Sequence, residues 1–293
     1  MASLKEVKSR INSVKSTRKI TPAMKMVASA KLHKAQGAVE NMLPYQKSLN
    51  KILSNFLSSD LPVGSPYVTE REVKRVAIVV FSSNTSLCGA FNSNVIKLLA
   101  KTVDEYRSLG KANILVFPVG RKAEDAVKKA GFVPQESLQG LADQPSYQKA
   151  LELAQRLLGM YAAGEVDRVE LIYHHFKSMG VQTLVYERYL PVDLAQMASA
   201  DKDSSAKHVA VDYIVEPSLE EVLADLIPTV LIQKMYTAAV DSNASEHAAR
   251  TLAMQVATDN ADDLIEDLTK QYNKGRQQAI TSELLDIVGG SMK

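Results

Sequence analysis

Several residue types that define common protein classes are scarce in this 293-residue chain. Tryptophan is absent and Cys88 is the single cysteine, which excludes an internal disulfide and a zinc site built from several cysteines. Aromatic residues make up only 6% of the chain, which favours helices over an aromatic-rich sandwich or barrel. No run approaches the ~18 apolar residues of a membrane span, and the charged start of the chain has no apolar signal core. We therefore expect an unprocessed cytosolic protein.

Charge is nearly balanced in total but unevenly distributed. Hydrophobic residues make up 46% and charged residues 23% of the chain, an ordinary composition for a protein with a buried core. The net charge of +2 hides a basic start and an acidic end: residues 1–57 hold eleven Lys or Arg and two acids, whereas residues 217–293 hold six and twelve. This pattern indicates that the two ends meet each other, or that one end meets an acidic partner, although two solvated helical faces would produce it as well.

Residues 1–57 have the spacing of a coiled coil. In heptads counted from residue 4, twelve of the sixteen a and d positions are apolar, so one seam persists for about eight heptads. The seam fails over residues 18–25, where Pro22 lies. Because proline removes a backbone hydrogen bond and crowds the carbonyl of Arg18, we expect a kink there. This interruption is also where a third partner could bind.

Residues 217–293 predict a second long helix. Ser218 is a suitable N-cap, and the interior contains one proline, Pro228, and one glycine, Gly275, before residues 289–290 (Gly-Gly), where we expect the helix to stop. Two helices of this length cannot bury their seams alone. Antiparallel pairing, with the middle of the chain inserted between them, satisfies both seams.

The middle of the chain, residues 58–216, alternates apolar runs with helical patterns. Strands are predicted at 75–83, 113–120, 168–176, 183–192 and 207–217, and helices at 94–109, 121–130 and 146–163. Such alternation predicts a small, mostly parallel sheet. The fold class is therefore α/β with long helices.

The middle region has only weak sequence signals for a chemical site. The loop 82–92 lies where a phosphate loop would, but it has one glycine, Gly89, and no lysine before Lys97, so a structural turn is the better interpretation. Cys88 has no positioned base and is expected to be buried. The histidines at 174–175 alternate across a predicted strand and cannot share a metal. We predict no catalytic residue, cofactor site or metal site.

Both ends of the chain carry features that suit partners. The basic N-terminal stretch could bind nucleic acid or an anionic membrane surface, but its basic residues spread around the helix and no aromatic precedes Tyr45 for base stacking, so nucleic-acid binding is a minority interpretation. The C-terminal run AITSELLDIVGGSMK is apolar at 280, 284, 285, 287 and 288. This run should dock against the N-terminal helix or against a surrounding partner.

Four segments closely resemble the gamma subunit of the F-type ATP synthase: MKMVASAKLHKAQ (24–36), SLCGAFN (86–92), SEHAARTLAMQVATDNADDLI (245–265) and YNKGRQQAITSELLDIVGG (272–290). The resemblance implies a bent antiparallel coiled coil of residues 1–57 and 217–293, with an inserted Rossmann-like α/β domain at 58–216. It also implies a non-catalytic rotor shaft that couples proton-driven rotation of the c-ring to the nucleotide sites of the beta subunits. Its partners would be the alpha, beta and epsilon subunits and the c-ring, on the cytoplasmic side of a bacterial inner membrane.

The same resemblance assigns contact residues position by position. Those matching the family's contacts with the alpha/beta ring are Met24, Lys25, Arg250, Gln277, Thr281 and Glu283. Those matching the foot that faces epsilon and the c-ring are Asp212, Tyr213, Glu216 and Pro217. The chain departs from the family at Pro22 and at residues 84–86, where the family usually has other residue types.

Two other functions stay open on the residues alone. The chain could be a small α/β nucleotide-binding protein with helical arms, which micromolar affinity for ATP would support. It could also be a coiled-coil tether for nucleic acid or a membrane, which a steep salt dependence of binding would support.

Overall fold

The computed structural model describes residues 3–57, 65–193, 215–216 and 218–291. The elements in chain order are α1 (Leu4–Leu57), β1 (Val76–Phe81), α2 (Phe91–Glu105), η1 (Arg107–Leu109), η2 (Lys111–Asn113), β2 (Ile114–Val119), α3 (Arg121–Lys129), α4 (Gln139–Asp143), α5 (Tyr147–Ala162), β3 (Arg168–Ser178), β4 (Val181–Leu190) and α7 (Leu219–Ser291). The chain forms two compact units, Met1–Ala30 with Arg250–Lys293, and Lys31–Ala249. The three-part division at 57/58 and 216/217 stays a prediction.

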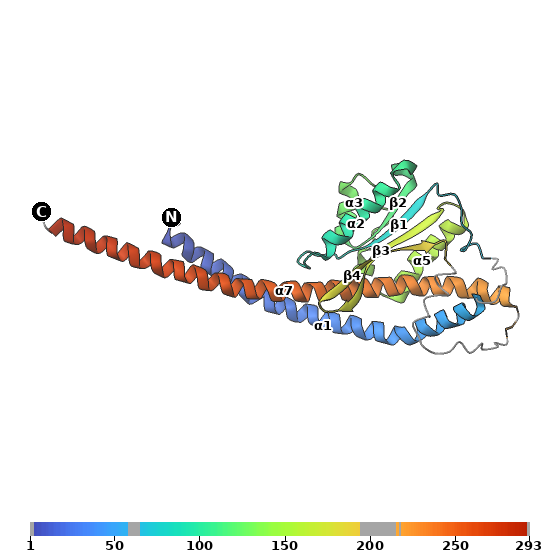
Figure 1. Ribbon diagram of the computed structural model, residues 1–293, viewed down its shortest axis with the longest axis horizontal. Helices are drawn as coiled ribbons and strands as arrows, with labels where there is room; N and C mark the ends of the chain where they lie inside the picture. Colours follow the sequence, from blue (N-terminus) through green and yellow to red (C-terminus); the bar gives the residue numbers. More distant parts are fainter. Residues whose placement is uncertain (1–2, 58–64, 194–214, 217, 292–293) are drawn as a thin grey trace. The chain divides into compact units, whose positions relative to one another are not determined.

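The first unit is an antiparallel pair of helices, formed by the start of α1 and the end of α7 (Figure 1). Its apolar cluster joins Val7 and Ile11 of α1 to Leu268 of α7. Further along α1, Thr21 meets Thr258, so residue numbers fall along α7 as they rise along α1. The predicted antiparallel coiled coil is confirmed here.

Both long helices tolerate residues that often end helices. α1 is continuous across Pro22, although proline leaves the carbonyl of Arg18 without its usual donor; a bend at this point stays a prediction. α7 likewise continues through Pro228. The expected stop at residues 289–290 is wrong, because α7 ends at Ser291. A glycine is only about 1 kcal/mol less favourable than alanine in a helix, so two glycines near the end of α7 do not prevent the helix from continuing.

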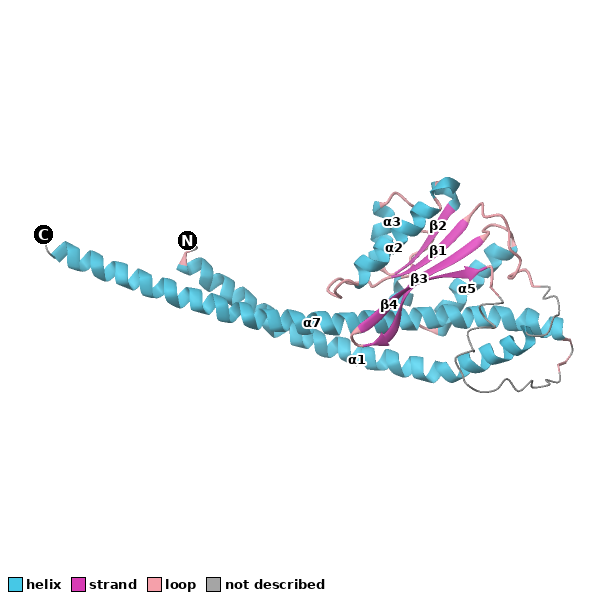
Figure 2. Cartoon of the chain, viewed as in Figure 1, coloured by secondary structure: helices cyan, strands magenta, loops and turns pink. Residues whose placement is uncertain are grey.

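The second unit is built on a four-stranded sheet with the order β2-β1-β3-β4 (Figure 2). β1 is parallel to both β2 and β3, and β4 is antiparallel to β3. The small, mostly parallel sheet is confirmed, as are the strands expected at 75–83, 113–120, 168–176 and 183–192. The strand expected at 207–217 falls almost entirely outside the described residues.

Helices cover both faces of this sheet. Ala77, Val79 and Phe81 of β1 belong to a large core shared with α5 and with parts of α1 and α7 inside this unit. The alternate residues, including Val76 and Ile78, belong to a smaller core with α2 and α3. Burial on both faces explains why β1 reads as an unbroken apolar run.

The helices of the inserted region lie where the sequence indicates, although α2 begins and ends three to four residues before the expected bounds. α2, α3 and α5 correspond to the helices expected at 94–109, 121–130 and 146–163. The hydroxyl of Ser146 accepts a hydrogen bond from the backbone N–H of Lys149 at 3.4 Å, so its predicted role as N-cap is confirmed. Within the described ranges, no helix has both the length and the apolar composition needed to cross a bilayer.

Candidate functional site

The seam between α1 and α7 in the first unit is interrupted by a polar segment consisting of Arg18, Thr21, Lys25, Gln255, Thr258 and Asp262. At its centre, Thr21 is 5% exposed and its hydroxyl lies 2.7 Å from that of Thr258. Because the Thr258 hydroxyl donates to the carbonyl of Met254, it must accept from Thr21. The break in the heptad pattern is therefore closed by a hydrogen bond between the helices.

Charged side chains flank this buried contact. The ammonium of Lys25 donates to Gln255 Oε1, and the Gln255 amide donates to Asp259 at 2.8 Å. On the other side, the guanidinium of Arg18 forms an ion pair with Asp262, and both side chains are about half exposed. An exposed pair of this kind contributes little to stability. The contacts of Lys25 with Gln255 and of Arg18 with Asp262 fix which residues of the two helices lie opposite each other. They add little to the free energy of pairing.

Large apolar side chains lie exposed around the polar segment. We call Ile20, Met26, Val27, Leu252, Val256 and Leu264 the outer apolar belt; each is between 45% and 74% exposed. The resemblance did not indicate these residues. The α1 members occupy b and c heptad positions, which normally face water, so apolar residues at outward positions were the available signal. Exposed apolar residues gathered in one region mark a contact surface.

The predicted ring-contact residues near the polar segment differ in exposure. Met24 and Lys25 are half-buried, with the exposed Met26 next to them. Arg250 is 8% exposed and is held by an interaction of its own within the protein. Only a small part of Arg250 is therefore accessible in the isolated chain. Its assignment as a ring contact stays a prediction.

The predicted contacts near the C-terminus lie on a stretch of α7 that extends beyond α1 (Figure 1). Gly275 packs against Leu4, at the start of α1, and every residue from 281 to 288 is exposed. Gln277, Thr281 and Glu283 are among the exposed residues, and the Thr281 hydroxyl donates to the Gln277 carbonyl. The apolar residues at 280, 284, 285, 287 and 288 are 49–68% exposed. The N-terminal helix does not cover them.

The predicted foot is only partly described. Tyr213, Asp212 and Pro217 lie outside the described residues. Glu216 is described and exposed, three residues before α7 begins. Met24, Lys25 and Arg250 all belong to the first unit, whereas the arrangement of the foot stays a prediction.

The loop 82–92 supplies its own acceptors to the helix that follows β2. The first N–H groups of α3 point at this loop: Arg121 donates to the Asn84 side chain, Lys122 to the Ser83 carbonyl and Ala123 to the Ser82 hydroxyl. The loop therefore packs against the start of α3, as a structural turn would.

Close packing explains two other features of the loop. Gly120 has φ of +100°, and a Cβ at this position would lie 2.3 Å from the carbonyl oxygen of Ser82. Cys88 is buried, as expected. Its sulfur lies 3.1 Å from the Asn92 amide nitrogen, and Asn92 also accepts from the backbone N–H of Ser83. Cys88 therefore belongs to the internal packing of the turn.

The two adjacent histidines point in different directions, as the strand alternation predicts. His174 is buried and stacks on Phe91 with 4.4 Å between ring centroids, and burial lowers its pKa to about 4. Nδ1 of His175 lies 2.6 Å from the Asp241 carboxylate on α7. In the part of the chain that the structure describes, no three metal-ligating side chains gather in one place.

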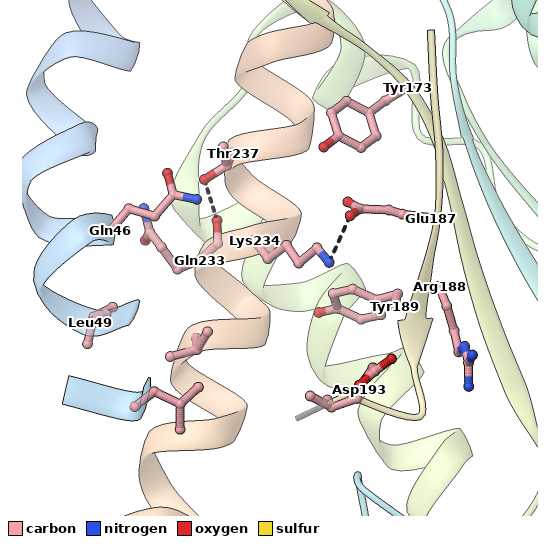
Figure 3. A pocket seen from close by; sticks show the side chains of 13 residues that line it. Gln46, Leu49, Tyr173, Glu187, Arg188, Tyr189, Asp193, Gln233, Lys234 and Thr237 are labelled. Atoms are coloured by element: carbon pink, nitrogen blue, oxygen red, sulfur yellow. Dashed lines mark hydrogen bonds and ion pairs between the residues drawn. The ribbon is translucent and has the colours of Figure 1, made fainter. Parts of the chain in front are cut away.

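A polar cavity of about 320 Å³ lies between α1, α7 and the β3–β4 hairpin in the second unit (Figure 3). Lys234 of α7 crosses it to Glu187 of β4 at 3.0 Å. Tyr189 donates to the carbonyl of Leu231 at 2.8 Å, and burial raises the pKa of Tyr189 above its ordinary value. These contacts attach the hairpin to α7. Since Lys234 pairs with Glu187 and the other lining cation, Arg188, pairs with Glu70 at 2.6 Å, both cations are engaged within the protein, and we describe the cavity as an internal joint.

Comparisons with known proteins agree with this architecture. A family model described as ATP synthase matches residues 3–292. The ATP synthase gamma chain of Bacteroides thetaiotaomicron is 72% identical over 298 residues, and that of Bacteroides fragilis is 70% identical over 292 residues; each alignment covers 100% of both chains. The chain belongs to the ATP synthase gamma chain family.

Solved structures give the same fold at lower identity. A chain in the central stalk and c-ring of the Tetrahymena thermophila mitochondrial ATP synthase is 25% identical, with a TM-score of 0.58 over 81% of this chain and 99% of that one. A chain of the Euglena gracilis mitochondrial enzyme is 20% identical, with a TM-score of 0.64 over 99% and 93%; this likeness concerns the fold alone. Two long helices with an inserted α/β region are thus the architecture of the gamma chain family.

Membership in the gamma chain family decides between the three hypotheses. The protein is the rotor subunit of the central stalk and is not catalytic by itself.

Proposed function

We propose that the first unit is the part of this rotor that contacts the alpha/beta ring. The observation that carries the proposal is the exposed apolar face of α7 beyond Gly275, where α1 provides no cover. Gln277, Thr281 and Glu283 flank this face. Apolar residues in water at every turn of a helix require a partner, and a ring that encloses the helix would bury them from all sides.

A second contact lies at the polar segment, with Met24 and Lys25 at its edge. The residues of the outer apolar belt are exposed on the same stretches of α1 and α7, and Arg250 of the same unit is buried. Basic residues of α1 would attract acidic loops of beta over distance. Arg18 is already paired with Asp262 inside the rotor. We expect few strong ion pairs with the ring, because deep energy minima would stop rotation.

The asymmetry of the helix pair explains how the rotor changes its partners. A shaft shifts a neighbour between conformations only if it binds those conformations with different affinity. The α1 segment of the pair is strongly basic and the α7 segment is acidic, so three surrounding beta subunits meet different faces. A proton potential supplies ~2.3 kcal/mol per charge per 100 mV, and the continuous helices carry this energy between the two ends.

We place the foot of the rotor at Tyr213 and Glu216, facing epsilon and the c-ring. The exposure of Glu216 supports this, and the Tetrahymena relative comes from a central stalk and c-ring assembly. The three segments 1–57, 58–216 and 217–293 would then act as shaft, inserted domain and shaft. We also place the protein on the cytoplasmic face of the inner membrane as a peripheral subunit, because its close relatives come from bacteria.

Reconstitution with alpha and beta subunits of the Bacteroides relative tests the ring contact. The variant Leu284→Asp with Ile287→Asp places charge on the exposed apolar face of α7. We expect at least a fivefold loss of ATP hydrolysis by the reconstituted complex. The matched control is Val133→Asp with Val181→Asp, which alters exposed apolar residues of the inserted region. Equal activity of the two double variants would contradict the proposal.

A further inference from the structure

A second cavity, unrelated to the joint of Figure 3, lies between α2, α3 and the edge strand β2. Its volume is about 380 Å³, within the range of small-molecule sites in proteins. Its floor is apolar: Leu99, Ile114, Val116 and Val127 line it and are only 1–6% exposed. These residues belong to the smaller core between the sheet and α2 and α3. The cleft therefore opens directly onto a hydrophobic interior.

Short side chains keep the cleft open. Ala100 on α2, Ala126 on α3 and Ala130 just after α3 all line it. A larger residue at any of these positions would extend into the space that the alanines leave. The opening thus follows from the residue types on two facing helices, and a single substitution can close it.

Two cations also line this apolar space. Arg107 of η1 and Lys111 of η2 line the cleft and are exposed. The Lys111 ammonium lies 5.3 Å from the centroid of the Phe132 ring and 3.5 Å from the Ala130 carbonyl oxygen. Asp104 is the acid among the lining residues. No ion pair found among the described residues involves Asp104, Arg107 or Lys111.

We propose that this cleft binds an amphiphilic monocarboxylate, an anion with an alkyl chain of medium length. The chain would cover the apolar floor, and the carboxylate would lie between the guanidinium of Arg107 and the ammonium of Lys111. Such a ligand satisfies both halves of the site: burial of methylene groups supplies affinity, and the two cations fix the direction of the chain.

The shape of the cleft selects a small ligand over a protein partner. A stable protein interface buries ~1,200 Å² or more and has an apolar centre. Among the lining residues, the large apolar Ile96, Val103 and Phe132 are half-buried, and those that lie exposed are charged or small. The apolar surface is concentrated inside the cavity, where a slender chain reaches it and a flat protein surface does not.

Decanoate is the probe for direct binding to the full-length chain. Since the chain lacks tryptophan, Val133→Trp at a 78% exposed position adds a single fluorescent reporter beside the mouth. We expect saturable binding of one decanoate per chain. Across butyrate, hexanoate, octanoate and decanoate, affinity should rise about fourfold per methylene, and it should level off in longer acids once the cavity is full. A rise that continues without saturation would indicate general adsorption and overturn the proposal.

Variants locate the binding. Ala126→Leu fills the cleft, and we expect it to weaken decanoate binding at least tenfold while thermal unfolding stays as cooperative as in the parent. Arg107→Gln and Lys111→Gln should each weaken binding about fivefold and leave the affinity for decanol unchanged. Leu284→Ser, which alters the exposed end of α7, is the control for adsorption elsewhere and should bind as the parent does. Unchanged affinity in Ala126→Leu, or loss of binding in Leu284→Ser, would refute the site.

Discussion

In the second unit every residue of α7 from 238 to 248 is buried, whereas in the first unit every residue from 281 to 288 of the same helix is exposed. The buried stretch includes polar residues that find partners on other elements: Asn243 donates to the Ala142 carbonyl and Ser245 to that of His174. The exposed stretch is rich in apolar residues instead. One helix thus has two environments, and its residue pattern in each stretch follows from what surrounds it.

The comparison also separates what holds each unit together. The second unit is stabilised by two apolar cores, one on each face of its sheet. The first unit relies on a narrow seam with a polar interruption. We infer that the second unit contributes most of the free energy of unfolding. The first unit keeps an apolar surface available for its partners.

The largest expected effect comes from making the same substitution at two places on α7. Leu231 is fully buried and Leu285 is 67% exposed. Leu231→Ala should lower the free energy of unfolding by about 2–5 kcal/mol because it leaves a cavity. Leu285→Ala should change it by less than about 0.5 kcal/mol. Urea denaturation of the isolated chain measures both, and similar values would remove the distinction between the two stretches.

A smaller effect concerns the acid that ties α3 to the segment following it. Glu124 accepts from Lys128, Ser137 and Gln139 at 2.6, 2.9 and 3.0 Å, and these bonds, with that to Lys128 the largest cause, lower its pKa to about 2. Because the folded pKa lies below the ordinary 4.5, its contribution is complete above pH 4.5 and is lost as the pH falls towards 2.

The variant Glu124→Gln tests that contribution. It should lower the free energy of unfolding at pH 7 by about 1–2 kcal/mol. Between pH 4.5 and 2 the variant should lose less stability than the parent. Denaturation at a series of pH values checks both expectations. Glu136→Gln is the control, since its ion pair with Arg156 is about 40% exposed. The same acid dependence in Glu124→Gln as in the parent would contradict the assignment.

A substitution in the polar segment of the first unit should lower the free energy of unfolding by about 1 kcal/mol. Thr21→Val keeps the shape of the side chain and removes the hydroxyl that donates to Thr258. Hydrogen exchange should increase in residues near 21 and 258 and stay unchanged in the sheet. Thr17→Val is the control, because the Thr17 hydroxyl bonds only within its own exposed turn. Equal effects of both variants would show that the contact between the helices is not what matters.

The smallest expected effect belongs to the exposed pair of Arg18 and Asp262. Arg18→Gln should destabilise the chain by no more than about 0.5 kcal/mol, and added salt should remove the difference. Thermal unfolding at low and high ionic strength measures this. A larger cost that persists in salt would mean that the first unit depends on this pair more than on its apolar seam.

Much of the fold could be predicted because its periodic signals are long. The apolar run of β1 is buried on both faces, and the heptad seam of α1 joins Val7 and Ile11 to α7. The cap at Ser146 was also readable, because capping is a local interaction. The site was harder: the resemblance supplied Met24 and Lys25, but the exposed neighbours Ile20, Met26 and Val27 carried only the weaker signal of apolar residues at outward heptad positions, and the structure was needed to show that they are exposed.

The sequence by itself determined the long helices, the strands and the order in which they occur, since these depend on the spacing of apolar residues along one segment. Only the tertiary structure decided that His175 meets Asp241, that the turn at 82–84 occupies the α3 N-terminus, and that α7 extends uncovered beyond α1. These features join residues that are far apart in the chain or depend on where a neighbour ends. Local periodicity contains no information about either.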